Sequence, residues 1–234
     1  MPTAANSVCR ICPYREQSVF CELPEHRLDE FCRLKLVSRY QKGQHIFYEG
    51  EPNLGLSILC SGKVKLDRTS NSGKTQILNI LGPCGLLGEK DLFLSDRHTV
   101  SAEALEDSVV GFVRKDDFLA FLTDNPTVAL RVIRRLAEQL AKIEERSFAL
   151  TALDVRQRLA ALLLDLADQH GKTLSGECLI DVALTRENLA EMIGATPETV
   201  IRVLSAFRKD GVIKDTAKQL VVLRPDELQR IAAS

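Results

Sequence analysis

Residues 184–214 read LTRENLAEMIGATPETVIRVLSAFRKDGVIK, and this stretch decides the fold of the C-terminal part of the chain. Thr185 can cap a first helix, which Gly194 ends at a point where a left-handed residue is wanted. Thr196 can cap a second helix with Pro197 in its first position, where the missing N–H costs nothing. Two short helices joined by a tight glycine turn predict a helix-turn-helix.

The second of these helices has an apolar face and a face suited to DNA. The apolar stripe consists of Val200, Val203, Leu204 and Phe207. The residues expected to contact DNA are Thr196, Glu198, Ile201, Arg202, Ser205, Arg208 and Lys209. Arginine can donate two hydrogen bonds to guanine, glutamate can accept one from cytosine, and isoleucine can touch a thymine methyl group. Arg208 and Lys209, near the helix end, suit phosphates, which position a protein without reading sequence.

An alternative reading of this face is purely structural. Glu198 and Arg202 are four residues apart, so they could form an ion pair on a solvated helix. The capped turn, the apolar stripe and the outward Ile201 favour the DNA-binding interpretation. Beyond the helix, residues 212–214 and 220–223 are apolar runs on either side of a polar turn, which predicts a hairpin wing.

Residues 126–150 give the clearest single helix of the chain. The apolar positions recur at alternating spacings of four and three and are Ala129, Ile133, Leu136, Leu140, Ile143 and Leu150, with Ser147 as the one interruption. A heptad spacing is typical of helices that associate with a second copy, although an amphipathic helix covering its own domain has a similar pattern. We expect a dimer interface at Ile133, Leu136, Leu140, Ile143 and Leu150.

The remaining elements flank this helix. Asp154 can cap a helix over residues 155–169, and residues 25–34 predict a short helix with one apolar face. Between residues 36 and 115, short alternating runs are separated by frequent turn glycines, which predicts a compact antiparallel roll or barrel. We divide the chain into a cysteine-rich segment (1–24), a β-roll (25–124), a dimerisation helix with hinge (125–153) and a winged helix-turn-helix (154–234).

Composition limits the classes of protein. Hydrophobic residues make up 45% and charged residues 27% of the 234 residues, as in ordinary globular proteins. No apolar run reaches the roughly 18–20 residues of a membrane helix, and no secretory signal is evident, so we expect a cytoplasmic protein. The net charge of −1 neither supports nor excludes nucleic-acid binding, because only the local charge matters there. No phosphate loop, nucleophile elbow or His/Glu metal motif points to an enzyme.

The order of these elements, over about residues 25–232, resembles the CRP/FNR family of bacterial regulators. The most specific stretches are residues 150–169 (LTALDVRQRLAALLLDLADQ) and residues 194–202 (GATPETVIR). The resemblance implies an α+β protein whose roll is a double-stranded β-helix like that of cyclic-nucleotide-binding domains. It also implies a homodimer that binds a palindromic site in double-stranded DNA and works with RNA polymerase. Ile201 departs from the small or hydroxyl residue expected there, which leaves the half-site open.

Cyclic-nucleotide-binding members of this family carry an Arg-Ser pair late in the effector cassette, which here begins near Gly88 and Glu89. This chain has Thr99 and Val100 at the place of that pair. It also has Ile143-Glu144 where those members place Thr-Ser against the base. We therefore expect no cyclic AMP binding, although the nearby Arg97 is a possible phosphate partner. A nucleotide-binding regulatory module without a DNA role is the rival from another class.

Cysteines crowd the N-terminus in a placement similar to the iron–sulfur, oxygen-sensing branch of the family. The expected ligands of a [4Fe-4S] cluster, one per subunit, are Cys9, Cys12, Cys21 and Cys32, with Cys84 as the alternative fourth. The family's later cysteine would fall near residues 108–113, where this chain has Gly111. We expect Cys60 and Cys178, which lie in apolar runs, to be inert. Zinc, a thiol–disulfide switch and cysteines without a sensory role remain alternatives, as does control by a small ligand in the β-roll.

Overall fold

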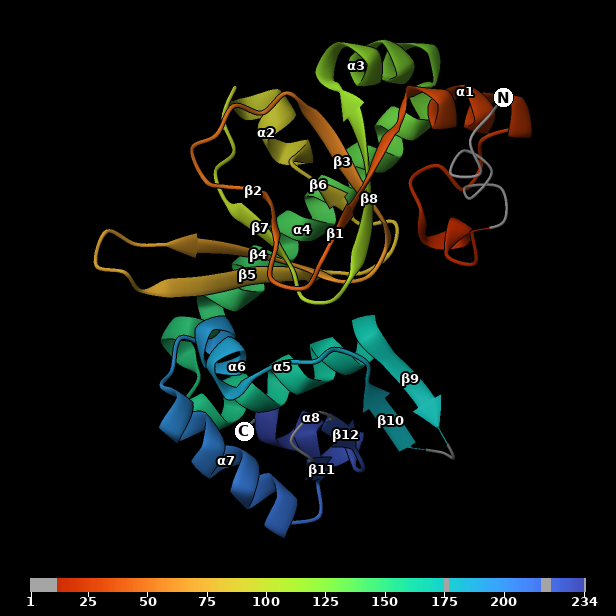
Figure 1. Ribbon diagram of the computed structural model, residues 1–234. Coiled ribbons are helices and arrows are strands. Elements are labelled where there is room, and N and C mark those ends of the chain that lie inside the picture. The colour runs from red at the N-terminus through yellow and green to blue at the C-terminus, as the bar shows by residue number, and fades with distance from the viewer. Residues whose placement is uncertain (1–11, 175–176, 216–219, 234) are drawn as a thin grey trace. The chain divides into compact units, whose positions relative to one another are not determined.

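A computed structural model describes residues 12–174, 177–215 and 220–233, which form two compact units (Figure 1). The described part of the first unit comprises residues 12–68 and 78–141. The second unit comprises residues 69–77 and the described residues from 142 onward. The division falls inside α4 (Pro126–Ala152), the long helix predicted over residues 126–150.

The roll consists of two four-stranded antiparallel sheets, which confirms the architecture predicted for residues 36–115. In spatial order, the first sheet contains β1 (Leu36–Tyr40), β8 (Ser108–Arg114), β3 (Gly55–Ser61) and β6 (Leu86–Leu87). The second contains β2 (His45–Phe47), β7 (Ser101–Ala104), β4 (Val64–Thr69) and β5 (Thr75–Leu81). The register of β3 against β8 places Ile58 opposite Gly111, so Gly111 lies in the middle of the first sheet.

Helices flank the roll at both ends of its sequence. The 3₁₀ turn η2 (Arg15–Gln17) precedes α1 (Glu25–Leu34), and α1 has the bounds predicted for it. Two helices were not predicted, α2 (Glu89–Leu94) and α3 (Lys115–Asp124). Gly88 takes φ +82° immediately before α2, and the helix has only six residues, too few for a 3.6-residue periodicity to stand out from strand alternation.

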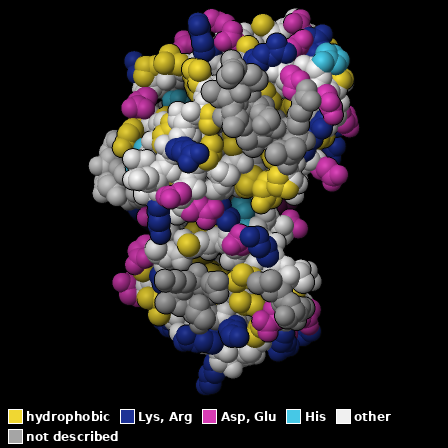
Figure 2. Space-filling model, turned by 45° about the vertical axis from the view of Figure 1, so that its right-hand side comes forward, with side chains coloured by type: hydrophobic (Ala, Val, Ile, Leu, Met, Phe, Trp, Pro, Cys, Tyr) yellow, Lys and Arg dark blue, Asp and Glu magenta, His cyan; other side chains and the backbone are white. Residues whose placement is uncertain are grey.

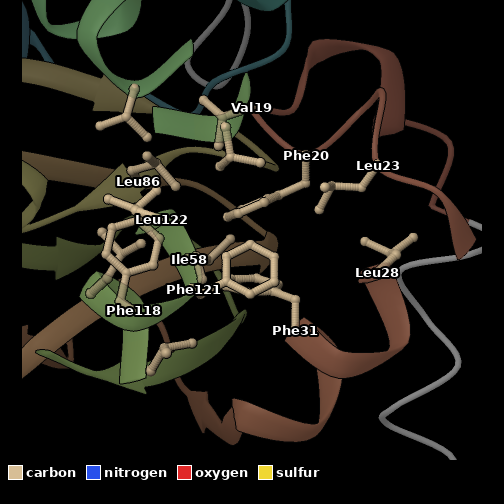
Figure 3. Packing of buried hydrophobic residues seen from close by; sticks show 14 of the residues in the cluster. Val19, Phe20, Leu23, Leu28, Phe31, Ile58, Leu86, Phe118, Phe121 and Leu122 are labelled. Carbon is tan, nitrogen blue, oxygen red and sulfur yellow. The ribbon is translucent and has the colours of Figure 1, made fainter. Parts of the chain in front are cut away.

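The core of the first unit includes part of the cysteine-rich segment. Val19, Phe20 and Leu23 are buried together with residues of α1, β3, α3 and α4 (Figure 3). The ring centroid of Phe31 lies 4.1 Å from that of Phe20 and 4.9 Å from that of Phe121. Burying an apolar side chain of this size contributes about 1.5–3 kcal/mol, so residues 19–23 are an integral part of the fold.

The second unit contains the predicted winged helix-turn-helix. The region predicted as the winged helix-turn-helix begins with α5 (Val155–His170), which Asp154 caps through a reciprocal capping box with Gln157. The two motif helices are α6 (Arg186–Ile193) and α7 (Pro197–Lys209), and α8 (Pro225–Ala233) closes the chain. Its sheet, in spatial order, consists of β11 (Ile213–Asp215), β12 (Leu220–Val222), β10 (Glu177–Ile180) and β9 (Gly171–Leu174). The pairing of β11 with β12 is the predicted wing hairpin, while β9 was not predicted.

The α+β architecture of antiparallel roll, long helix and winged helix-turn-helix is therefore confirmed. Within the described ranges, no helix is both long and apolar enough to span a bilayer.

Candidate functional site

The turn between α6 and α7 is built from the caps that the sequence predicted. Thr185 accepts a hydrogen bond from the backbone N–H of Asn188 at 3.1 Å, and the Asn188 side chain accepts one from the Thr185 N–H at 3.2 Å. Gly194 ends α6 in the left-handed region with φ +64°. Thr196 then caps α7 through the N–H of Thr199 at 3.4 Å. These local bonds fix the angle at which α7 leaves the turn.

Helix α7 presents the expected polar face to solvent. Its inner residues Val200, Leu204 and Phe207 are buried, and Val203 is half-buried. The exposed residues of the outer face are Thr196, Glu198, Ile201, Arg202, Arg208 and Lys209. Ser205, which was predicted for the same face, is less exposed: it is half-buried and accepts a hydrogen bond from Arg208 at 3.4 Å. Ile201 is 50% exposed, which is unusual for an isoleucine on a helix whose other face holds the core.

The structural alternative for this face, an ion pair between Glu198 and Arg202, is not formed. Among the described residues, no ion pair within 4.0 Å joins the two side chains. The backbone N–H of Glu198, followed by the hydroxyl of Thr196, lowers the pKa of the Glu198 carboxyl, so this side chain stays ionised at neutral pH. Both charged groups therefore remain available to a ligand. Figure 2 shows Lys and Arg side chains gathered at the end of the second unit where α7 finishes.

Helix α4 exposes a stripe of large apolar side chains. Ile133, Leu140 and Ile143 are 60%, 57% and 61% exposed, and Leu150 is exposed to 41%. The stripe also includes Leu130 and Phe148, 66% and 68% exposed, which the heptad count missed. Leu136 differs from these residues, because its side chain is partly buried against the core of the first unit, and its place in a dimer interface stays a prediction. One face of a helix can pack against the core of its own domain while a second face is also apolar. The spacing of apolar residues therefore does not show which of them are exposed.

A pocket in the first unit brings three cysteines together. Its lining consists of Cys12, Arg15, Ser18, Phe20, Leu28, Phe31, Lys35, Ile58, Leu59, Cys60 and Cys84. The sulfur atoms of Cys12 and Cys84 are 4.0 Å apart, and the Cys84 thiol lies 3.4 Å from the carbonyl oxygen of Tyr14. Cys60 had been expected to be inert, but β3 directs it to this pocket.

The electrostatics of the pocket keep Cys84 protonated while no metal is bound. Burial, followed by the neighbouring Cys12 thiol, raises the pKa of Cys84 to about 12. A metal that binds the sulfur would have to displace this proton. Metal binding would therefore release protons, and the metal affinity would depend on pH. The Arg15 and Lys35 side chains supply positive charge to the same pocket.

The other predicted ligands lie elsewhere. Cys32 is 1% exposed inside the apolar core, so its sulfur does not reach the pocket, which corrects its assignment as the fourth ligand. Cys21 is half-buried beside Arg131 of α4 and does not line the pocket. Cys9 lies outside the described residues. Among the residues that the structure describes, no three His, Cys, Asp or Glu side chains are close enough to hold one metal ion.

The effector cassette at α2 is occupied by internal hydrogen bonds. Thr99 donates its N–H and hydroxyl to the buried Asp91 at 3.1 and 2.9 Å. Arg97, the possible phosphate partner, donates to the carbonyl oxygen of Gly50 at 2.6 Å. Glu89 accepts from the Gln139 amide at 3.0 Å, and burial raises the pKa of its carboxyl despite Gln139 and Arg135 nearby.

Comparisons with known proteins agree with this arrangement. A cyclic nucleotide-binding domain family matches residues 37–125, and a Crp-like helix-turn-helix domain family matches residues 157–231. The "CRP-like cAMP-activated global transcriptional regulator" of Mycobacterium tuberculosis is 31% identical over 82% of this chain and 86% of its own length. The "Transcriptional activator protein FnrL" of Cereibacter sphaeroides is 27% identical over 92% and 87%.

Among solved structures, FixK2 from Bradyrhizobium japonicum shares the fold, with a TM-score of 0.75 at 24% identity over 86% of this chain and 98% of that one. Fold, motif geometry and relatives agree, and the chain belongs to the CRP/FNR family of DNA-binding transcription regulators.

Proposed function

We propose that the protein is a homodimeric, cytoplasmic regulator that binds a palindromic DNA site through α7, and that an iron–sulfur cluster on its N-terminal cysteines controls its DNA affinity. The observation that carries the sensing part is the approach of Cys12 to Cys84 across 72 residues of sequence, in a pocket lined by a third cysteine. The relative FnrL is named a transcriptional activator, which supports the regulatory part of the proposal.

Cys12 and Cys84 offer two of the ligands that a metal–thiolate group needs, and the others would have to come from further cysteines of the chain. Cysteine thiolates are the usual ligands of iron–sulfur clusters, and the complexes that they form are anionic. Arg15 and Lys35 offer compensating positive charge at the pocket wall. The sulfurs of Cys12 and Cys84 would separate to accept a cubane, since 4.0 Å is closer to the spacing around a single ion. Such a cluster, when bound, supplies a centre that oxygen or nitric oxide can destroy.

The segment that holds Cys12 is connected to the dimerisation helix. Val19 and Phe20 pack in one core with Val128 and Val132 of α4. Glu22 forms an ion pair with Arg131 on the same helix. Ordering of the segment around a ligand at Cys12 therefore favours one position of α4 and, through it, the dimer that presents two recognition helices to DNA.

DNA reading is assigned to α7. Arg202 and Glu198 contact base edges, Ile201 contacts a thymine methyl group, and Arg208 and Lys209 contact phosphates. A dimer would place its two helices in successive major grooves, about one helical turn apart, and RNA polymerase is the expected protein partner. Cyclic AMP control is the less favoured alternative, because Thr99 is bonded to Asp91 and Arg97 to Gly50.

A thiol–disulfide switch is the second candidate, because the same 4.0 Å separation is within a small side-chain movement of a disulfide.

The test of the iron–sulfur proposal begins with protein purified without oxygen. Iron, acid-labile sulfide and absorbance near 400 nm are measured, and affinity is measured for a site selected from random DNA. Wild type should hold about four iron and four sulfide per subunit.

Cys12→Ser should lose the cluster and change DNA affinity at least tenfold under anaerobic conditions. Cys178→Ser, the same substitution in the second unit, should change neither property. Iron-free, colourless wild type that cannot be reconstituted would refute the cluster. Unaltered DNA affinity in Cys12→Ser would refute its control of DNA binding.

A further inference from the structure

We propose that Cys84, and not Cys32, is the ligand through which the β-roll joins Cys12 in the metal–thiolate centre. This inference rests on the proposed function, because it names one ligand of that same centre. Cys84 stands between β5 and β6, and its sulfur is 4.0 Å from that of Cys12. The two residues belong to different parts of the chain, so a shared metal would fasten the N-terminal segment to the roll.

The backbone at Cys84 indicates that the thiol is used. Cys84 takes φ +66°, and among the described residues the other positions with positive φ are all glycines. A residue with a side chain is strained in this left-handed region, whereas glycine adopts it freely. The fold at this turn would therefore be satisfied by glycine, and what cysteine adds is a sulfur atom directed at Cys12.

The surroundings of Cys84 suit an anionic centre. The Nε atom of Arg15 is buried at this pocket and has no hydrogen-bond partner among the described residues. Lys35, which lines the same pocket, is also buried. Thiolates bound to a metal carry net negative charge, and these two cations offset it.

Gly111 of β8 lies beside the same pocket. A Cβ atom added at Gly111 would lie 3.0 Å from the Lys35 side chain and 3.6 Å from the sulfur of Cys60. Lys35 and Cys60 both line the pocket that holds Cys12 and Cys84. Of the thiols near this pocket, Cys84 is the one in contact with Cys12.

The test compares metal content in three variants of the full chain, each purified and reconstituted without oxygen. Cys84→Gly removes the sulfur and leaves the residue that the backbone prefers, so the variant should fold and melt like wild type in the metal-free state. Its iron and sulfide content should fall at least tenfold. Cys32→Ser and Cys60→Ser should keep the wild-type content and the wild-type visible spectrum.

A second measurement tests the contact without any metal. Treatment of metal-free wild type with the thiol oxidant diamide should yield a Cys12–Cys84 disulfide, identified by mass spectrometry of the digested protein. Full cluster content in Cys84→Gly, or the absence of this cross-link, would overturn the assignment. Loss of the cluster in Cys60→Ser alone would assign the ligand to Cys60 instead.

The outcomes for this ligand and for the cluster itself are separable. Wild type that binds one zinc ion, with loss of zinc in Cys84→Gly, would support the ligand and refute the iron–sulfur proposal. Wild type that holds a cluster equally well without Cys84 would refute the ligand alone.

Discussion

Replacing Leu140 with alanine should weaken the dimer without weakening the fold. Leu140 lies on α4, and its side chain is 57% exposed in the single chain. An exposed leucine contributes little to the stability of its own subunit. If α4 pairs with a second copy, however, this exposed surface becomes buried, and its removal is felt in association.

The magnitude follows from the exposed fraction. Leucine to alanine removes three carbons, and each buried carbon is worth about 0.8 kcal/mol. Scaling that sum by the 57% of the side chain still available for burial gives about 1.4 kcal/mol per subunit. Two copies lose about 2.7 kcal/mol, which corresponds to a dimer dissociation constant about 100-fold higher.

Sedimentation equilibrium of the DNA-free protein measures this constant directly. Leu94→Ala is the matched control, because Leu94 of α2 is 75% exposed and lies on no proposed interface. It should leave the constant unchanged, and both variants should melt within about 2 °C of wild type under conditions where the chain is monomeric. An unchanged dissociation constant in Leu140→Ala would refute a dimer built on this stripe of α4.

Three further predictions concern DNA, pH and ligand. Arg202→Ala should cost about 1–3 kcal/mol of affinity for the selected site and relax specificity at one base pair, whereas Arg208→Ala should weaken binding to all sequences and reduce the salt slope by about one, both measured by fluorescence anisotropy. Burial raises the pKa of the Glu89 carboxyl above its ordinary value of 4.5. Above pH 4.5 the folded chain therefore holds a proton that the unfolded chain has lost, and the free energy of unfolding falls as the pH rises toward the pKa of the folded state. The melting temperature of Glu89→Gln should therefore rise relative to that of wild type as the pH increases above 4.5, and a difference that does not change with pH would contradict this. Cyclic AMP at about 1 mM should not shift the melting temperature, whereas a site with a 10 µM dissociation constant would add about 2.7 kcal/mol.

The parts of the structure predicted from sequence are those specified by neighbouring residues. The caps at Thr185 and Thr196 and the left-handed Gly194 are local features, and each was found where the sequence placed it. The outward position of Ile201 followed from helix periodicity alone. The exposed face of α7 could therefore be predicted almost completely from the sequence, while its contacts with DNA stay a prediction.

The cysteine pocket could not be read in this way, because it depends on tertiary contacts. Cys32 is nearest to the other cysteines in sequence, yet α1 turns it into the apolar core. Cys84 is 72 residues from Cys12 and meets it because the roll brings the turn between β5 and β6 to the N-terminal segment. The sequence did name Cys84 as an alternative ligand, but it could not show that Cys84 lies next to Cys12.

In the proposed mechanism, a change at the cysteines reaches α4 through side chains that pack directly against it. Phe20 lies within the cysteine-rich segment, next to Cys21, and shares its core with Val128 and Val132, one turn apart on α4. Coupling of 1–3 kcal/mol between two sites changes affinity by 5- to 150-fold. Repositioning one or two buried side chains of this core is worth that much, so loss of a ligand at Cys12 needs to disturb only the packing around Phe20 to alter the dimer.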